Sequence, residues 1–159
     1  MLTETSDPLT IQASENKIKF TLGKIKLISK VIDGKFLASA GADNAIKVWD
    51  FEKGEQARTI AGHTKQISRL QFVGVTPTFI TCSGDKSMRI WNVDTGGAVK
   101  TFANAEDFLY ALASSVDGTI VASGGEAGVI YIYNNATGAL IKKLGPTGAI
   151  EPEKAPLKK

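Results

Sequence analysis

The sequence is poor in the residues on which most catalytic and metal sites depend. Its 159 residues include a single histidine, His63, and a single cysteine, Cys82. One cysteine excludes an internal disulfide, and one histidine with one cysteine leaves a zinc site to be built mainly from carboxylates. No metal and no cofactor are therefore expected. Because Cys82 follows Thr81 in an apolar, strand-like segment, we expect its thiol to be buried and unreactive.

Strong charge and long apolar runs are missing as well. The formal net charge is +3, which gives no basic footprint of the kind that nucleic-acid-binding proteins carry. No apolar run approaches the roughly 18 residues of a membrane span, and the opening residues lack the apolar region of a signal peptide. The sequence thus predicts neither a nucleic-acid nor a membrane partner. The cytoplasm is the default compartment, unless the N-terminus is truncated.

What the sequence does contain is a repeat with a period of 42 residues. Three sets of positions are in step, namely Trp49, Trp91 and Tyr133, then Gly54, Gly96 and Gly138, then Ser39, Thr81 and Ser123. Within a repeat, four short apolar segments alternate with turn residues, which predicts four β-strands. In the second repeat these predicted strands are Ile67–Phe72, Phe79–Ser83, Met88–Val93 and Val99–Phe102.

The most complete repeat opens with Gly62-His63 and closes with Trp91-Asn92, and the first repeat closes with Trp49-Asp50. A period near 40, with a Gly-His start and a Trp-Asp finish, resembles the WD40 repeat, in which each repeat forms one blade of a β-propeller. The resemblance covers residues 15–144. It implies an all-β fold of three four-stranded antiparallel blades, in a propeller that is incomplete or is completed by oligomerisation.

This resemblance divides the chain into a lead-in, three blades and a tail. The expected segments are a flexible lead-in at 1–14, a surplus outer strand at 15–20, blades at 21–60, 63–102 and 105–144, and a disordered tail at 145–159. Propellers usually close with about 4 to 8 blades, so three blades do not close a ring by themselves.

The resemblance also implies a hydrogen-bonded structural tetrad inside each blade. In it, a histidine bridges an aspartate and a hydroxyl group, and that hydroxyl reaches an indole N–H. The second repeat supplies His63, Thr81, Asp85 and Trp91, the first supplies Ser39, Asp43 and Trp49, and the third supplies Ser123 alone. We therefore expect the third blade to depend most on apolar packing.

Partner binding is expected on loops, because a rigid scaffold holds them and their side chains are not committed to packing. In the resembled family, one rim of the propeller is a frequent docking surface. Carried over to this chain, the rim consists of Asn44, Lys65, Gln66, Lys86, Glu106, Asp107, Phe108 and Glu126. Its mixed charge and single aromatic ring favour a protein or peptide partner. A rim that is merely solvated is the alternative.

Three functional hypotheses remain open at this stage. The first is a non-enzymatic protein-interaction scaffold that forms part of a larger propeller, which the surplus outer strand favours. The second is self-association, with two copies giving six blades or three giving nine, and the extra N-terminal strand then needs a place. The third is an enzyme, with Thr81, His63 and Asp85 as a catalytic set or with a catalytic channel. Apolar residues such as Leu70 and Leu112 on the inner strands argue against it.

Overall fold

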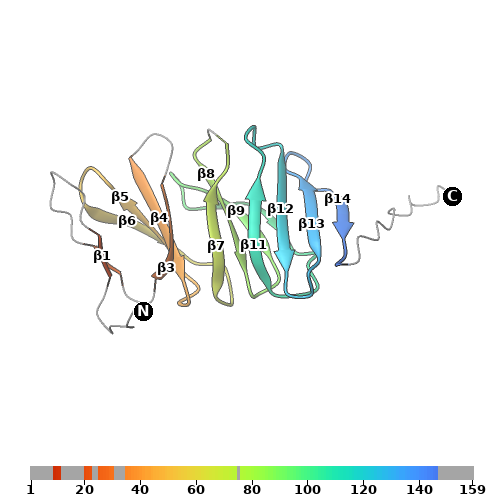
Figure 1. The fold of residues 1–159 in the computed structure, drawn as a ribbon. Coiled ribbons are helices and arrows are strands. Elements are labelled where there is room, and N and C mark those ends of the chain that lie inside the picture. Colours follow the sequence, from red (N-terminus) through yellow and green to blue (C-terminus); the bar gives the residue numbers. More distant parts are fainter. Residues whose placement is uncertain (1–8, 12–19, 23–24, 31–34, 75, 147–159) are drawn as a thin grey trace.

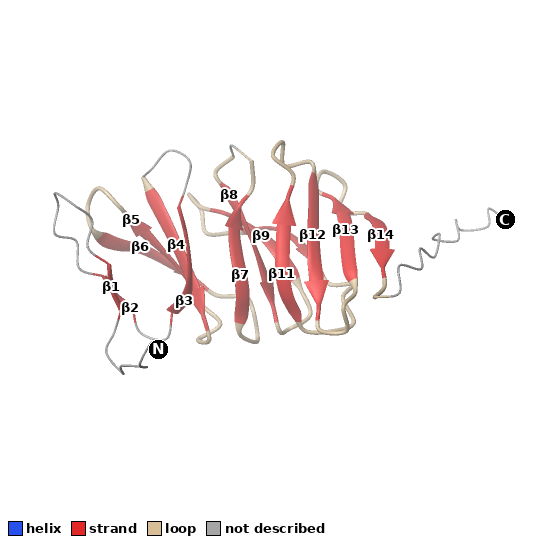
Figure 2. Ribbon diagram, in the orientation of Figure 1, coloured by secondary structure: helices blue, strands red, loops and turns tan. Residues whose placement is uncertain are grey.

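All regular elements that the structure describes are β-strands. The computed structural model describes residues 9–11, 20–22, 25–30, 35–74 and 76–146, and these form one two-stranded and three four-stranded antiparallel sheets (Figure 2). The predicted all-β class of three four-stranded blades is therefore confirmed. Within the described residues, no helix is long and apolar enough to cross a membrane.

Each four-stranded sheet is one sequence repeat, with its strands hydrogen-bonded in chain order. The first blade contains β3 (Ile25–Lys30), β4 (Phe36–Gly41), β5 (Ile46–Asp50) and β6 (Glu55–Ile60). The second contains β7 (Ile67–Phe72), β8 (Thr78–Ser83), β9 (Met88–Asn92) and β10 (Ala98–Phe102). The third contains β11 (Leu109–Ser114), β12 (Ile120–Gly125), β13 (Ile130–Asn134) and β14 (Leu140–Leu144). The strands of the second blade agree with their predicted bounds to within one residue.

The turn between the third and fourth strands has the same construction in every blade. An Asp or Asn oxygen accepts hydrogen bonds from backbone N–H groups within the turn, and a glycine with positive φ follows four residues later. The pairs are Asp50 with Gly54 (φ 71°), Asn92 with Gly96 (φ 73°) and Asn134 with Gly138 (φ 78°). Because only a side-chain oxygen is needed, asparagine replaces aspartate after Trp91 and Tyr133 without loss of the turn.

Two apolar layers hold the three blades together. The first contains Ala38, Ala40, Ile46, Val48 and Ile60 of the first blade against Ile67, Phe72, Phe79, Trp91 and Val93 of the second. The other contains Val73, Ile80, Cys82, Met88, Ile90 and Phe102 of the second blade against Leu109, Val121, Tyr131 and Tyr133 of the third. The second blade is thus packed on both faces, which explains why β8 is buried from Phe79 to Ser83 without alternation. Figure 1 shows the blades as a row of sheets.

The N-terminal segment contains a pair of strands that the sequence did not predict. β1 (Leu9–Ile11) pairs antiparallel with β2 (Phe20–Leu22) as a separate sheet, at the end of the row where the first blade lies (Figure 1). β1 falls in the stretch expected to be a flexible lead-in, and its three residues are too few for a periodicity to stand out. The expected surplus strand at 15–20 lies mostly outside the described residues, as does the expected tail beyond residue 146.

Candidate functional site

The second blade carries a buried hydrogen-bonded network of four side chains. His63 Nδ1 lies 2.8 Å from Asp85 Oδ2, and His63 Nε2 lies 2.8 Å from Thr81 Oγ1. The indole Nε1–H of Trp91 donates to the same Thr81 oxygen, also at 2.8 Å. The loop before β7, the turn after β8 and the strands β8 and β9 are therefore tied together by a single network.

The chemistry of the groups fixes the direction of these bonds. Burial lowers the pKa of His63, although the hydrogen bond to Asp85 acts in the opposite direction, so the ring is neutral near pH 7. Burial alone would raise the pKa of Asp85, but hydrogen bonds from Ser87 and His63 outweigh it and lower that pKa to about 2. The carboxylate therefore accepts from Nδ1–H of His63, Nε2 accepts from the Thr81 hydroxyl, and the Thr81 oxygen accepts from Trp91.

The Gly-His pair has a steric reason in this structure. A Cβ atom placed on Gly62 would lie 2.6 Å from Cη2 of Trp91, so no other residue fits without moving the ring. The imidazole of His63 meets the indole of Trp91 edge-on, with ring centroids 5.9 Å apart. The glycine thus lets the chain pass over the indole just before the histidine enters the network.

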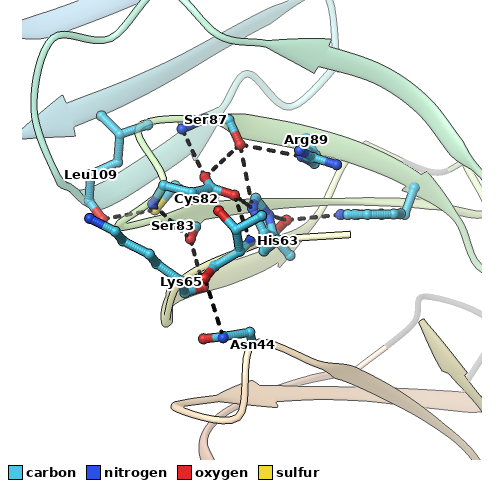
Figure 3. Close-up of polar contacts among 12 residues, drawn as sticks. Asn44, His63, Lys65, Cys82, Ser83, Ser87, Arg89 and Leu109 are labelled. Atoms are coloured by element: carbon cyan, nitrogen blue, oxygen red, sulfur yellow. Dashed lines mark hydrogen bonds and ion pairs between the residues drawn. The ribbon is translucent and has the colours of Figure 1, made fainter. Parts of the chain in front are cut away.

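Two serines that were not predicted from the sequence complete the network. The Ser87 hydroxyl donates to Asp85 Oδ1 at 2.6 Å, and the Ser83 hydroxyl donates to the carbonyl of Lys65 at 2.9 Å (Figure 3). Both serines are buried. Along this tight turn, polar side chains stand at every second position, namely Ser83, Asp85 and Ser87. That spacing is typical of side chains that hydrogen-bond to nearby backbone groups, and it could have identified both serines from the sequence.

The first blade keeps a shorter version of the network. Trp49 Nε1–H donates to Ser39 Oγ at 2.8 Å, which repeats the Trp91 to Thr81 bond. Asp43 is exposed and forms an ion pair with Lys47 at 3.7 Å and a long hydrogen bond with the N–H of Ala45. The histidine position is held by Thr21, whose side chain lies outside the described part.

The third blade has lost the network. The Ser123 hydroxyl is buried and has no hydrogen-bond partner among the described residues. Tyr133 replaces the tryptophan and packs on Phe102 of the second blade, with ring centroids 4.8 Å apart. Tyr131 contributes a different bond, because its hydroxyl accepts from the N–H of Glu106 at 3.1 Å.

The structure places the eight expected rim residues on loops and loop ends along one edge of the blades. Lys65, Lys86, Glu106 and Glu126 are exposed, whereas Asn44, Gln66, Asp107 and Phe108 are half-buried. Phe108 stacks on the half-exposed ring of Tyr110, with centroids 4.6 Å apart.

Hydrogen bonds between neighbouring blades fix this rim. The amide of Asn44 donates to the carbonyl of Thr64 at 3.5 Å, and Lys86 Nζ donates to the carbonyl of Glu106 at 2.7 Å. These donors are 42 residues apart, as are their acceptors, and both donors have positive φ, 62° and 68°. Lys143 Nζ also pairs with Glu106 Oε1 at 2.6 Å. The rim is therefore one connected surface.

Comparison with known proteins assigns the fold to a family. The family described as "WD domain, G-beta repeat" (WD40) matches three stretches of this chain, residues 28–50, 54–92 and 96–134. The chain belongs to the WD40-repeat family. Each matched stretch ends in the third strand of a blade, at the tryptophan or tyrosine and the Asx residue described above.

Curated WD40 relatives resemble this chain over part of their length. It is 30% identical to a "WD repeat-containing protein 89 homolog" of Dictyostelium discoideum over 67% of this chain and 29% of the relative. It is 32% identical to a "Probable coatomer subunit beta'" of Schizosaccharomyces pombe over 62% of this chain and 12% of the relative. It is 31% identical to "Nuclear distribution protein nudF" of Aspergillus niger over 68% and 25%. The chain thus spans less than a third of each of these relatives.

WD40 repeats build protein-interaction scaffolds, generally without catalysis, and the geometry of this chain fits that role. Thr81, the nucleophile of the catalytic hypothesis, is fully buried, and its oxygen already binds His63 and Trp91. Cys82 is also fully buried, and burial raises the pKa of its thiol to about 12. In the described part of the chain, no group of three or more His, Cys, Asp or Glu side chains is placed to hold a metal ion.

Proposed function

We propose that this WD40 chain is a non-enzymatic scaffold that docks a protein or peptide through the rim formed by Asn44, Lys65, Gln66, Lys86, Glu106, Asp107, Phe108 and Glu126. The observation that carries the proposal is the repeated hydrogen bond across each blade boundary, from Asn44 to Thr64 and from Lys86 to Glu106. A loop surface held in this way loses little conformational entropy when a partner binds.

The composition of the rim supports a polypeptide partner over a nucleic acid or a membrane. Its two exposed lysines, Lys65 and Lys86, are followed along the chain by two exposed glutamates, Glu106 and Glu126, so both signs of charge are present and neither dominates. The stacked pair of Phe108 and Tyr110 adds an aromatic contact of the kind that is enriched in protein interfaces. One relative is by its name a subunit of coatomer, an assembly, which agrees with a scaffold role. The cytoplasm remains our proposed compartment.

The remaining blades of the propeller come from outside the three repeats of this chain. Three blades fall short of the roughly 4 to 8 that close a ring, and each relative is more than three times as long as the stretch that this chain matches. The scaffold therefore functions as a segment of a ring, and its rim continues onto neighbouring blades.

A charge exchange across the rim tests the docking surface. Lys65→Glu with Glu126→Lys reverses two exposed charges on the rim and keeps the net charge constant. The control is Lys65→Arg with Glu126→Asp, which keeps both charges at the same exposed positions. Proteins retained by the immobilised chain are identified by mass spectrometry. We expect specific partners to be lost from the rim variant and kept by the control. Equal binding by both variants, or equal loss from both, contradicts the proposal.

A further inference from the structure

The outer strand of each of the first two blades carries a cation that binds the next blade. The guanidinium of Arg58, in β6, donates to the carbonyl of Asp94. Lys100 Nζ, in β10, donates to the carbonyls of Asn135 and Ala136, the latter at 2.7 Å. Arg58 and Lys100 are 42 residues apart, as are Asp94 and Ala136. This inter-blade tie is therefore a property of the repeat, and it is separate from the rim on the opposite edge.

The glycine of the accepting turn lies in van der Waals range of the cation's aliphatic stem. A Cβ atom on Gly96 would lie 3.4 Å from Cδ of Arg58, and one on Gly138 would lie 3.5 Å from Cδ of Lys100. Both glycines also have positive φ, which other residues rarely adopt. In each tie, the aliphatic part of the Arg or Lys side chain therefore packs on the glycine of the turn, and its charged group donates hydrogen bonds to the turn's carbonyls. A charged donor makes such hydrogen bonds stronger than neutral ones.

The third blade has a lysine at the position of Arg58 and Lys100, but among the described residues no turn of a following blade lies next to it to accept its hydrogen bond. Lys142, in β14, stands 42 residues after Lys100 and 84 after Arg58. It is half-buried, and its amino group makes no hydrogen bond or ion pair with any residue that the structure describes. The blade therefore presents a donor placed for a turn that these three blades do not supply.

The apolar face of the third blade beside Lys142 also has no blade packed against it in the described part of this chain. In the second blade, Ile80, Met88 and Ile90 are at most 3% exposed, because the third blade covers them. Their counterparts 42 residues later are Ala122, Ile130 and Ile132, of which Ile130 is 43% exposed and the other two are half-buried. Figure 1 shows the sheet of β11 to β14 at the end of the row, so this face continues the series of blade-to-blade interfaces.

We propose that a second copy of this chain docks on the exposed face of the third blade, and that Lys142 binds the carbonyls of its Asp50–Gly54 turn. That turn has the construction of the two known acceptors, because the Asp50 side chain accepts from the N–H groups of Glu52 and Lys53 and Gly54 has positive φ. By the period of 42, Phe51 and Glu52 correspond to the acceptors of Lys100.

The geometry of the repeat selects a dimer over other stoichiometries. If the third blade of each copy docks on the first blade of the other, two identical contacts close a ring of six blades, within the usual range of about 4 to 8. Three copies would give nine. The β1–β2 pair lies at the first-blade end in Figure 1, so the incoming blade packs beside this pair or displaces it.

Cross-linking in the chain of 159 residues tests the predicted contact. We would introduce Lys142→Cys and Glu52→Cys together, since Glu52 corresponds to the acceptor position of Asp94 and Ala136. The native Cys82 is buried and does not interfere. Mild oxidation is expected to give a disulfide-linked dimer that non-reducing electrophoresis detects. Lys142→Cys paired with Glu126→Cys, on the opposite rim, is the matched control and is expected to stay monomeric on the gel.

Light scattering after size exclusion supplies the second measurement. The unmodified chain is expected to show twice the monomer mass, and Lys142→Glu is expected to raise the dissociation constant about tenfold or more, because it replaces a charged donor by a carboxylate that repels the carbonyls. Ile130→Glu should separate the copies, whereas Val116→Glu should not, because Val116 is 96% exposed on a turn. Circular dichroism confirms that each variant is folded.

Three results would overturn the proposal. One is a chain that stays monomeric at every concentration, which would show that a second copy of this chain does not cover the exposed face. Another is an oligomer whose mass is unchanged by both Lys142→Glu and Ile130→Glu. The last is equal cross-linking of the test pair and the control pair, which would show random collision. The rim variants above do not touch this face, so their outcome is independent of this one.

Discussion

The second and third blades have the same number and order of strands but different buried polar side chains. Both are four-stranded antiparallel sheets with the same order and the same glycine turn. The second contains the network of His63, Thr81, Asp85 and Trp91, whereas the third retains the single hydroxyl of Ser123, which has no described partner. The blade fold is therefore specified by strand patterning and turn chemistry, and the network adds to a sheet that forms without it.

The first blade lies between these two cases. Its indole donates to Ser39 as Trp91 donates to Thr81, but Asp43 stays at the surface with Lys47. Trp49 is half-buried, whereas Trp91 is 2% exposed. The same residue type at the same repeat position thus has a different environment in each blade. Each of the following substitutions therefore has a counterpart in another blade, 42 or 84 residues away, that serves as its control.

Removal of the tryptophan from the second blade is expected to cause the largest loss. Trp91→Ala deletes a buried ring from the layer between the first two blades and leaves the Thr81 hydroxyl without its donor, so we expect a loss of about 3 to 5 kcal/mol in the free energy of unfolding. Trp49→Ala removes a half-buried ring and is expected to cost about 2 kcal/mol less. Urea denaturation followed by circular dichroism measures both values. Equal losses would show that burial does not distinguish the two blades.

The hydroxyl at the centre of the network comes next. Thr81→Val keeps the shape of the side chain but leaves the indole N–H of Trp91 and Nε2 of His63 without a partner. At about 1 to 3 kcal/mol for each unsatisfied buried group, we expect a loss near 3 kcal/mol. Ser39→Ala, which removes one hydrogen-bond acceptor of the half-buried Trp49 indole, is expected to cost about 1 kcal/mol in the same urea titration. A Thr81→Val variant as stable as the wild type would mean that the network contributes no net stability.

Most of the fold could be predicted from the sequence, because the repeat shows each pattern three times. The strands of the second blade and the division into three sheets follow from apolar segments between turn residues. The positions of His63, Thr81, Asp85 and Trp91 were assigned from a resemblance to WD40 repeats, and the structure brings these four side chains into one network. Here local propensity and the repeat period agree.

What the sequence did not predict depends on contacts between repeats or on very short elements. The tie from Lys100 to the next turn needs the distance between two blades, which no periodicity within one repeat gives. β1 has only three residues and pairs with a strand that is equally short. Ser87 was not predicted because the expected tetrad consists of four other residues and does not include it. Each of these features depends on how segments pack in three dimensions, which the sequence pattern of one repeat does not specify.

Acidification provides a third comparison. Since the pKa of Asp85 is lowered to about 2 in the folded state, the unfolded chain binds a proton first as the pH falls, and stability is lost between about pH 4 and pH 2. The lowered pKa of His63 adds a loss that begins below about pH 6.5. We expect Asp85→Asn to be less stable at pH 7 and to lose less stability between pH 4 and pH 2 than the wild type.

Thermal unfolding monitored by circular dichroism from pH 8 to pH 2 measures this dependence. Asp43→Asn is the matched control, because it changes the corresponding exposed residue of the first blade, and it is expected to follow the wild-type curve. An Asp85→Asn curve that runs parallel to the wild type below pH 4 would contradict the assignment of the acid-labile group to Asp85.

The smallest effect is expected in the third blade, and its sign is the opposite of the others. Ser123 is 2% exposed, and its hydroxyl meets no described partner, so the folded state leaves unsatisfied a group that water satisfies in the unfolded chain. Ser123→Ala removes that group at little cost in packing and is expected to leave the free energy of unfolding unchanged or to raise it by up to about 1 kcal/mol. Its counterpart Ser39→Ala should destabilise the chain, because Trp49 donates to that hydroxyl. A substantial loss in Ser123→Ala would show that the third blade retains a polar contact, and the contrast between the blades would then rest on apolar packing alone.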